Sequence, residues 1–249
     1  MRRLIIRPGA IGDFIVSLPA MELIRADYLE VWTGSANVPL ARFADRARPI
    51  ASTRLDLLGI AETSVVDELR RFDSIVSWYG TNREEFREAV RELPVQFLRA
   101  LPPEQVGMHA TDFYLEQVRA LATRNVDPVP RIACPAADRE NFAVIHPFSG
   151  SARKNWPLEK FRYLASRLER VMRVRWCAGR EDPPLEGAVH IDDLYELASW
   201  LAKARLYIGN DSGITHLAAA VGTPVLALFG PSDPDVWAPR GFNVRVGRW

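Results

Sequence analysis

The stretch Ile208–Ala220, with the sequence IGNDSGITHLAAA, joins an apolar run to a glycine-containing turn and then to an alanine-rich helical pattern. This order predicts a β-strand that ends in a tight turn, followed at once by an α-helix. Glycines at such a turn let the backbone approach a ligand, and the unpaired N–H groups at the helix start favour an anion. The sequence therefore predicts an anion-binding turn at Gly209–Gly213, where a diphosphate would lie at the carboxyl end of a parallel strand.

The same turn has a second interpretation, in which it binds no ligand. Asp211 or Ser212 is placed to cap the helix, and a cap is compatible with ligand binding. His216 lies four residues after Ser212 on the same helical face, and taken alone it is more typical of a buried core histidine. If the turn binds an anion, the candidate contacts are Asn210, Asp211, Ser212, Gly213 and His216.

Apolar runs and helical patterns alternate along the rest of the chain, which is typical of parallel sheets covered by helices. A shift to proline and turn-forming residues at 125–131 predicts a domain boundary at about residue 135. We therefore expect two Rossmann-like domains, 1–135 and 136–249, that face each other across a central cleft. The expected strands are 4–6, 29–32, 74–78, 95–98, 142–146, 171–177, 206–208 and 224–229, and the expected helices are 14–24, 111–121, 156–170, 193–202 and 215–221.

Composition excludes several classes of protein. With 249 residues, 48% hydrophobic and 25% charged, the chain has the make-up of an ordinary globular protein. A net charge of +1 argues against a dedicated nucleic-acid binder. Cys134 and Cys177 are expected to be buried, reduced thiols, with a disulfide or a catalytic role as the alternatives. No apolar run is long enough to span a membrane, and the basic N-terminus leads into a predicted strand, which argues against a signal peptide.

Two further loops follow predicted strands and would lie beside the first turn. The loop after 142–146 offers the hydroxyls of Ser149 and Ser151 and the charge of Lys154 to the same diphosphate, although Lys154 taken alone is typical of a solvated charge. The loop 229–234, FGPSDP, follows the last strong strand. The three loops, at 209–213, 147–155 and 229–234, all follow strands and all carry Gly and Ser, with Asp in two of them. Together they predict one ligand-binding site.

A second strand, glycine turn and helix begin at Arg7–Asp13, with the sequence RPGAIGD. The spacing lacks the third glycine of the dinucleotide fingerprint, which disfavours a nicotinamide cofactor. Asp13 at the helix start is either a simple cap or, facing a cleft, a carboxylate that acts as a base toward an acceptor hydroxyl.

Taken together, these stretches resemble the heptosyltransferase family, glycosyltransferase family 9, which has the GT-B fold of two Rossmann-like domains. The matching stretches come in the family's order: PGAIGD at 8–13 with SLPA at 17–20, HP at 146–147 with KNWP at 154–157, GNDSG at 209–213 with HLAAA at 216–220, and ALFGPSDP at 227–234.

The resemblance implies a metal-independent, inverting glycosyltransferase without a cofactor. It would move a sugar, heptose in this family, from an ADP-activated donor to a cell-envelope saccharide such as the lipopolysaccharide core. Negative charge that develops on the leaving diphosphate would be stabilised by helix N-termini and a lysine in place of a metal. By position, the resemblance implies that Asp13 is the general base. It implies that Lys154, Asp211, Ser212 and Gly213 contact the donor phosphates, and that His216 is the family's histidine behind this turn. Glu181 would contact the donor ribose.

The resemblance also implies that the first domain carries the acceptor. Gly12, Arg70, Arg71 and Arg83 are the candidate contacts for an anionic saccharide, with a solvated surface as the alternative reading of the arginines. The implied location is the cytoplasm, in peripheral contact with the inner membrane, where the acceptor would be a lipid-linked saccharide. The chain is short for the family and stops soon after Asp233 without the usual closing helix.

Two alternatives remain open on the sequence alone. One is a catalytically idle relative that binds a nucleotide sugar or scaffolds a cell-envelope complex. The other is a different GT-B chemistry, such as a sugar-nucleotide epimerase or hydrolase.

Overall fold

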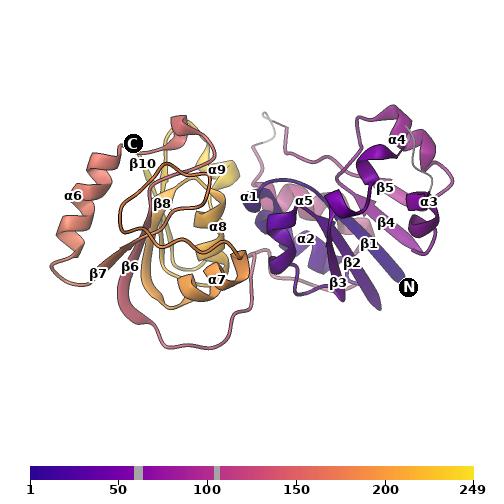
Figure 1. Cartoon of the computed structure of the whole chain (residues 1–249). Coiled ribbons are helices and arrows are strands. Elements are labelled where there is room, and N and C mark those ends of the chain that lie inside the picture. The colour runs from indigo at the N-terminus through magenta and orange to yellow at the C-terminus, as the bar shows by residue number, and fades with distance from the viewer. Residues whose placement is uncertain (59–63, 104–106) are drawn as a thin grey trace. The chain divides into compact units, whose positions relative to one another are not determined.

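The computed structural model describes residues 1–58, 64–103 and 107–249 of the chain (Figure 1). Its contacts divide the chain into two compact units. The first comprises Met1–Ala10, Ser17–Val106 and Ala110–Pro128, and the second comprises Ile11–Val16, Gly107–His109 and Val129–Trp249. Each unit contains a five-stranded sheet whose paired strands run parallel, which confirms the predicted α/β class.

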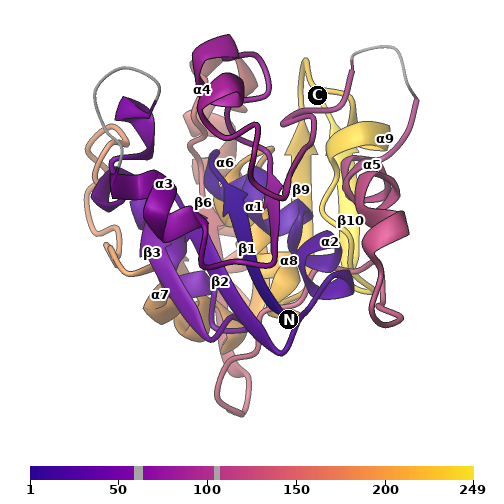
Figure 2. The same cartoon turned by 90° about the vertical axis from the view of Figure 1, so that its right-hand side faces the viewer.

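The sheet of the first unit has the strand order β3-β2-β1-β4-β5, and β2 and β1 lie side by side in Figure 2. Its strands are β1 (Arg2–Arg7), β2 (Tyr28–Thr33), β3 (Arg46–Pro49), β4 (Ser74–Ser77) and β5 (Val95–Phe97). Its α-helices are α2 (Leu18–Leu23), α3 (Ser64–Leu69), α4 (Glu84–Ala89) and α5 (Ala110–Val118), and its short 3-10 helices are η1 (Ser35–Leu40), η2 (Ile50–Ser52), η3 (Leu55–Leu57) and η4 (Arg119–Leu121).

The sheet of the second unit has the order β10-β9-β8-β6-β7, with α6 on one side and α7 and α8 on the other (Figure 1). Its strands are β6 (Glu140–His146), β7 (Arg173–Trp176), β8 (Ala204–Asn210), β9 (Val225–Phe229) and β10 (Val244–Arg248). Its helices are α1 (Ile11–Val16), η5 (Ala152–Lys154), α6 (Leu158–Leu168), α7 (Leu194–Ala202), α8 (Gly213–Ala220) and α9 (Pro234–Trp237).

Both sheets are buried through their central strands, because helices cover both faces. In β1, Leu4, Ile5 and Ile6 are at most 1% exposed, so the strand reads as a continuous apolar run. The alanines of α8 are buried too, and their small side chains let that helix lie close to the sheet. On the other face, α6 packs through Phe161 and Ala165.

The strand order marks where ligands are expected. In an open parallel sheet, the crevice lies at the carboxyl ends of the two neighbouring strands from which the chain winds in opposite directions. These strands are β1 and β4 in the first sheet, and β6 and β8 in the second. The predicted loops after β1, β6 and β8 therefore lie at these two points.

The strands predicted from apolar runs are all present, but β3 and β10 were not predicted, nor were the helices α3 and α4. Of the two cysteines, which are both free thiols, Cys177 is buried as expected, whereas Cys134 is only half-buried. Burial raises the pKa of Cys177 to about 12, so this thiol is not ionised near neutral pH. No helix in the described part of the chain has the length and apolar character needed to span a membrane.

Candidate donor site at the carboxyl edge of the second sheet

The helix α8, which follows the turn after β8, is capped by Ser212 and not by Asp211. Ser212 is the N-cap residue, and its hydroxyl accepts a hydrogen bond from the backbone N–H of Thr215 at 3.4 Å. The backbone N–H of Asp211 donates to the carbonyl of Leu228 on β9 at 3.0 Å. Because Ser212 caps the helix, the carboxylate of Asp211 is available for another partner.

That partner is Lys154, which lies in the short helix η5 after β6. Its Nζ atom donates to Oδ2 of Asp211 at 2.7 Å. The carboxylate is only 7% exposed, whereas the lysine side chain is 38% exposed. The lysine charge is thus held beside the start of α8, with enough exposure to reach a ligand as well.

Asn210 joins the two loops of this site. Its side chain is fully buried. The amide nitrogen donates to the carbonyl of Pro147 at 2.7 Å, and the amide oxygen accepts from the backbone N–H of Trp156 at 2.9 Å. The amide was predicted to contact the donor, but these two bonds give it a role in holding the loop that carries Lys154.

Of the two predicted serines, Ser149 holds the loop in shape and Ser151 does not. The hydroxyl of Ser149 lies 2.8 Å from the carbonyl of Ser151 and 2.7 Å from Oδ1 of Asn155, so it is used to shape the loop. In the part of the chain that the structure describes, the hydroxyl of Ser151 makes no hydrogen bond, and the residue is half-buried. Of the two, Ser151 is the better placed to meet a ligand.

The first turn of α1 meets the first turn of α8 within the second unit. A Cβ atom added to Gly213 would lie 2.7 Å from Cβ of Ile11 and 2.9 Å from the backbone nitrogen of Gly12. The two helices therefore approach this closely only because residue 213 is glycine. Their N-termini, each carrying positive partial charge, converge at one place, and this arrangement favours an anion.

The helix α1 also brings Asp13 to the second unit. Asp13 is half-buried and lies in the first turn of α1, next to Gly12. Sequence order alone placed it in the first domain, facing the diphosphate turn from the other side of a cleft. By contacts, α1 packs with α8, so Asp13 and Gly213 belong to the same compact unit.

His216 lies behind this helix junction and is 5% exposed. Burial lowers its pKa to about 4, although the nearby negative charge of Asp211 acts in the opposite direction. His216 is therefore neutral at neutral pH. A Cβ on Gly12 would lie 3.5 Å from its Cδ2 atom, so the ring packs against the start of α1.

A second polar pair at this edge of the sheet was missed by sequence reasoning. Nε2 of His146, at the end of β6, lies 3.1 Å from Oδ2 of Asp182, and the backbone N–H of Gly179 donates to the same oxygen at 2.7 Å. Burial alone would raise the pKa of Asp182, but these hydrogen bonds outweigh it and hold the pKa below its ordinary value. The only signal for this pair was that His146 ends one strand and Asp182 follows the neighbouring one. Glu181, which was predicted, is exposed.

The candidate acceptor arginines do not gather in one place. Arg70 and Arg71 follow α3 and precede β4, so they lie near the amino ends of the strands. Arg70 pairs with Asp67 at 2.7 Å. Arg83 lies beyond the carboxyl end of β4, where it donates to the hydroxyl of Tyr79 at 2.6 Å. Of the three, only Arg83 lies on the edge where ligands of such sheets bind.

Comparison with known protein families agrees with a site made of a turn, a lysine and two helix N-termini. Residues 86–248, more than half of the chain, match glycosyltransferase family 9 (heptosyltransferase). The chain belongs to this family. It is therefore a glycosyltransferase with the GT-B fold that the sequence motifs indicated.

Individual members of family 9 give the same result. Lipopolysaccharide heptosyltransferase 1 of Pseudomonas aeruginosa is 30% identical over 303 residues, which cover 100% of this chain and 82% of the relative. Lipopolysaccharide heptosyltransferase 3 of Escherichia coli K12 is 29% identical over 150 residues, which cover 54% of this chain and 44% of the relative.

Solved structures of the family share the fold. A family 9 glycosyltransferase from Veillonella parvula has a TM-score of 0.79 and 17% identity, covering 100% of this chain and 86% of that chain. The E. coli heptosyltransferase WaaC, solved with ADP, has a TM-score of 0.72 and 20% identity, covering 100% and 93%.

Proposed function

We propose that this glycosyltransferase moves a heptose from an ADP-activated donor to a saccharide of the lipopolysaccharide core, with inversion and without a metal. The observation that carries the proposal is the meeting of Lys154 and the N-termini of α1 and α8 around one point, with Asp13 in the first turn of α1. The names of the relatives support the substrates, because the two described above are lipopolysaccharide heptosyltransferases. In addition, the E. coli heptosyltransferase WaaC was solved with ADP-2-deoxy-2-fluoro heptose.

In the proposed reaction, an acceptor hydroxyl oxygen attacks the anomeric carbon of the donor sugar. The bond from that carbon to the diphosphate oxygen breaks, and ADP leaves with the electron pair. Asp13 takes the proton of the attacking hydroxyl. Lys154 and the positive ends of the helix dipoles of α1 and α8 stabilise the charge that develops on the diphosphate.

We assign the rest of the donor to the loops at the same edge. Ser151, Ser212 and Gly213 flank the diphosphate, and His216 supports the junction of α1 and α8 from behind. Asn210 and Ser149 act through the loop that they hold.

The donor ribose is assigned to the loop after β7. Glu181 is exposed there, and the neighbouring Asp182 has one carboxylate oxygen fixed by His146 and by the N–H of Gly179. A carboxylate in this loop would accept hydrogen bonds from the ribose hydroxyls.

We place the acceptor at the carboxyl ends of β1 and β4 in the first sheet, where Arg83 lies beyond β4. Gly12 follows β1 in the sequence but belongs by contacts to the second unit. A lipid-linked acceptor would bring the enzyme to the cytoplasmic face of the inner membrane in peripheral contact.

The test is donor-dependent transfer by the purified protein. ADP-heptose should raise the unfolding temperature, since ligand at 100 times its Kd stabilises the native state by about 2.7 kcal/mol. ADP should be released when a lipopolysaccharide-core acceptor is added. Stabilisation by ADP without release in the presence of acceptor would indicate an idle nucleotide-binding protein, and the absence of both would overturn the proposal.

Lys154→Met tests the donor half of the site separately. Loss of one charged hydrogen bond to the diphosphate should weaken ADP binding by roughly 10- to 100-fold, measured by calorimetry. Lys203→Met is the matched control, because Lys203 is exposed at the C-cap of α7. Equal ADP affinity in the two variants would remove Lys154 from the site.

A further inference from the structure

Three hydroxyl groups meet under the first turn of α8, behind the candidate donor turn. The Oγ1 atom of Thr215 lies 3.2 Å from the hydroxyl of Tyr207 and 3.1 Å from the hydroxyl of Ser212. The same Oγ1 atom donates to the backbone carbonyl of Asn210, at the end of β8. Tyr207 and Thr215 are fully buried. Their hydroxyls therefore depend on each other, and not on solvent, for hydrogen bonds.

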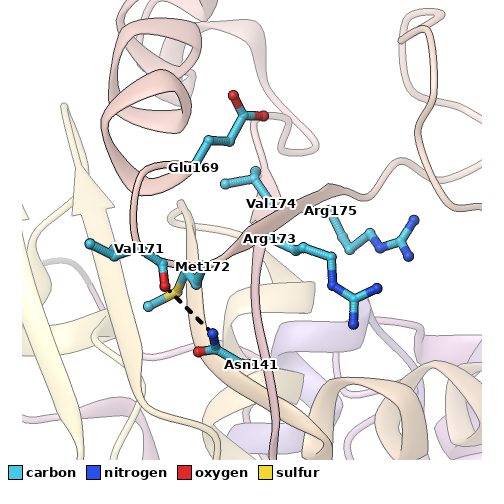
Figure 3. A pocket seen from close by; sticks show the side chains of 7 residues that line it. All are labelled: Asn141, Glu169, Val171, Met172, Arg173, Val174 and Arg175. Carbon is cyan, nitrogen blue, oxygen red and sulfur yellow. Dashed lines mark hydrogen bonds between the residues drawn. The ribbon is translucent and has the colours of Figure 1, made fainter.

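The alternation of side chains in the second sheet directs Tyr207 toward α8. Figure 3, a close view of the hollow beside β7, shows Arg173 and Arg175 extending the same way from that strand. Val174, between them, packs on the other face with the core residues of α6. Val144 on β6 pairs with Arg175 on β7 and with Tyr207 on β8. Tyr207 thus lies on the face opposite α6, which α7 and α8 cover (Figure 1).

Gly209 leaves the space that the Tyr207 ring occupies. A Cβ atom added to Gly209 would lie 2.5 Å from the hydroxyl oxygen of Tyr207 and 2.9 Å from two of its ring carbons. The ring therefore lies along β8 toward the carboxyl end of the strand. The sequence predicted that glycines in this turn let a ligand approach, whereas Gly209 makes room for a side chain of its own strand.

The hydroxyl protons in this cluster can be assigned by counting donors and acceptors. The carbonyl of Asn210 only accepts, so it takes the single hydroxyl proton of Thr215. Because Thr215 Oγ1 then has only lone pairs left, the hydroxyls of Tyr207 and Ser212 both donate to it. Burial raises the pKa of Tyr207, so its hydroxyl keeps the proton that it donates. The proton of the Ser212 hydroxyl consequently points into the protein.

We propose that Tyr207 and Thr215 are positioning residues for the donor diphosphate, because they hold Ser212 so that the turn meets the anion with backbone N–H groups. An anion is bound by hydrogen-bond donors. The Ser212 hydroxyl, whose proton is directed to Thr215, offers a diphosphate only lone pairs. A turn that is ordered before the ligand arrives binds more tightly, since less conformational freedom is lost on binding. These roles rest on the proposed donor site at α8.

ADP calorimetry with the full chain tests the positioning role. Thr215→Val keeps the shape of the side chain and removes its hydroxyl, and it should weaken ADP binding roughly fivefold, the effect of one neutral hydrogen bond. Thr215→Ser keeps the hydroxyl and should restore affinity to within about twofold of the wild type. Tyr207→Phe should weaken ADP binding roughly two- to fivefold, and it tests the same cluster if Thr215→Val does not fold.

Thr223→Val is the matched control for a purely structural effect. Thr223 follows the C-terminal end of α8, is 1% exposed, and donates its hydroxyl to the carbonyl of Leu201 at 2.8 Å. The control also removes a buried hydroxyl from the second unit, so it should lower the unfolding temperature but leave ADP affinity unchanged. Equal ADP affinities of Thr215→Val and Thr223→Val would overturn the proposal.

Ser212→Ala distinguishes the proposed role from direct binding by the serine hydroxyl. A hydroxyl that donated to the diphosphate would, when removed, weaken ADP binding by roughly 10- to 100-fold. The proposal predicts a loss of about fivefold or less. The double variant Ser212→Ala, Thr215→Val should bind ADP about as well as the weaker single variant, because the two hydroxyls act as one unit. A loss of more than about tenfold for Ser212→Ala, or losses that multiply in the double variant, would contradict the proposal.

The wild-type protein separates this result from the proposed function. A wild type that does not bind ADP would remove the donor site itself. A wild type that binds ADP, together with a Thr215→Val variant that matches the Thr223→Val control, would overturn only the positioning role and leave the transferase proposal intact.

Discussion

The turns after β1 and β8 have the same arrangement of strand, turn and helix, but different side chains hold them in place. Each follows a central strand of its sheet, contains glycine and leads into a short helix, and the two helices meet at Gly12 and Gly213. The turn after β8 is fixed by polar side chains: Asn210 ties it to the loop after β6, and Ser212 caps α8.

The turn after β1 is held mainly by backbone conformation and by Arg7 at its base. Gly9 has a φ of 120°, which side-chain-bearing residues rarely adopt, and its carbonyl accepts from Asn37 at 3.1 Å. Arg7 is 1% exposed, donates to the Ser17 hydroxyl at 3.0 Å and lies 4.7 Å from the ring centroid of Tyr114.

The difference indicates a division of labour. The β8 turn keeps its backbone N–H groups and the adjacent lysine in fixed positions, as binding of a diphosphate requires. The β1 turn instead presents the carboxylate of Asp13. In the proposed function, the β8 turn holds the anion and the β1 turn supplies the base.

The largest expected effect comes from removing that base. Asp13→Asn should lower kcat by roughly 10²- to 10⁴-fold, the usual contribution of a general base. ADP affinity should stay equal or increase, because a negative charge close to the diphosphate is lost. Steady-state transfer rates and ADP calorimetry measure the two quantities.

Asp138→Asn, on an exposed loop, is the control for this experiment. A kcat for Asp13→Asn equal to that of the control would show that the β1 turn supplies no base, and the division of labour would fail.

The sequence predicted the central part of the fold well, for a physical reason. Val225–Phe229 is covered on both sides and so must be apolar throughout, which makes it visible without any structure. Edge strands have no such requirement. Arg46–Pro49 and Val244–Arg248 are rich in arginine and become strands only because a neighbouring strand pairs with them.

The site shows the same limit. Lys154 and Asp211 were predictable neighbours, since they follow adjacent parallel strands. The contact between His146 and Asp182 was not, because it depends on how the loop at Gly179 turns the carboxylate back toward β6. The hydrogen bonds from the amide of Asn210 to Pro147 and Trp156 also depend on the loop conformation, so the sequence did not reveal them.

A matched pair of asparagines tests whether an asparagine side chain contributes more to holding the β8 turn than to holding the β1 turn. Asn210→Ala leaves two buried backbone groups without partners and should cost about 2–4 kcal/mol of unfolding free energy. Asn37→Ala removes one hydrogen bond, and the other end of this amide has no partner among the described residues, so it should cost about 1 kcal/mol. Chemical denaturation measures both, and equal losses would contradict the comparison.

A matched pair of glycines tests the contact between the two helices. Gly213→Ala places a methyl group 2.7 Å from Cβ of Ile11 and should cost about 1–3 kcal/mol. At Gly12 the nearest atoms would lie at 3.5 Å, an ordinary contact, so Gly12→Ala should be neutral or stabilising by up to about 1 kcal/mol. Thermal unfolding distinguishes the two; a similar loss in both would mean that the helices are not packed as described.

The smallest effect concerns His216, which supports the junction from the α8 side. Its pKa falls from 6.5 to about 4 on burial, so the unfolded chain binds the proton more tightly than the folded one. The contribution of neutral His216 to stability is complete above its unfolded pKa and is lost as the pH falls toward its folded pKa, by at most about 1.4 kcal/mol per pH unit. His216→Gln should therefore lose less stability over this range than the wild type, whereas His190→Gln, at an exposed position, should follow the wild type. If His216→Gln instead follows the wild-type pH dependence in chemical denaturation, the histidine is not held neutral at the helix junction, and the acid sensitivity of the second unit must arise from its carboxylates.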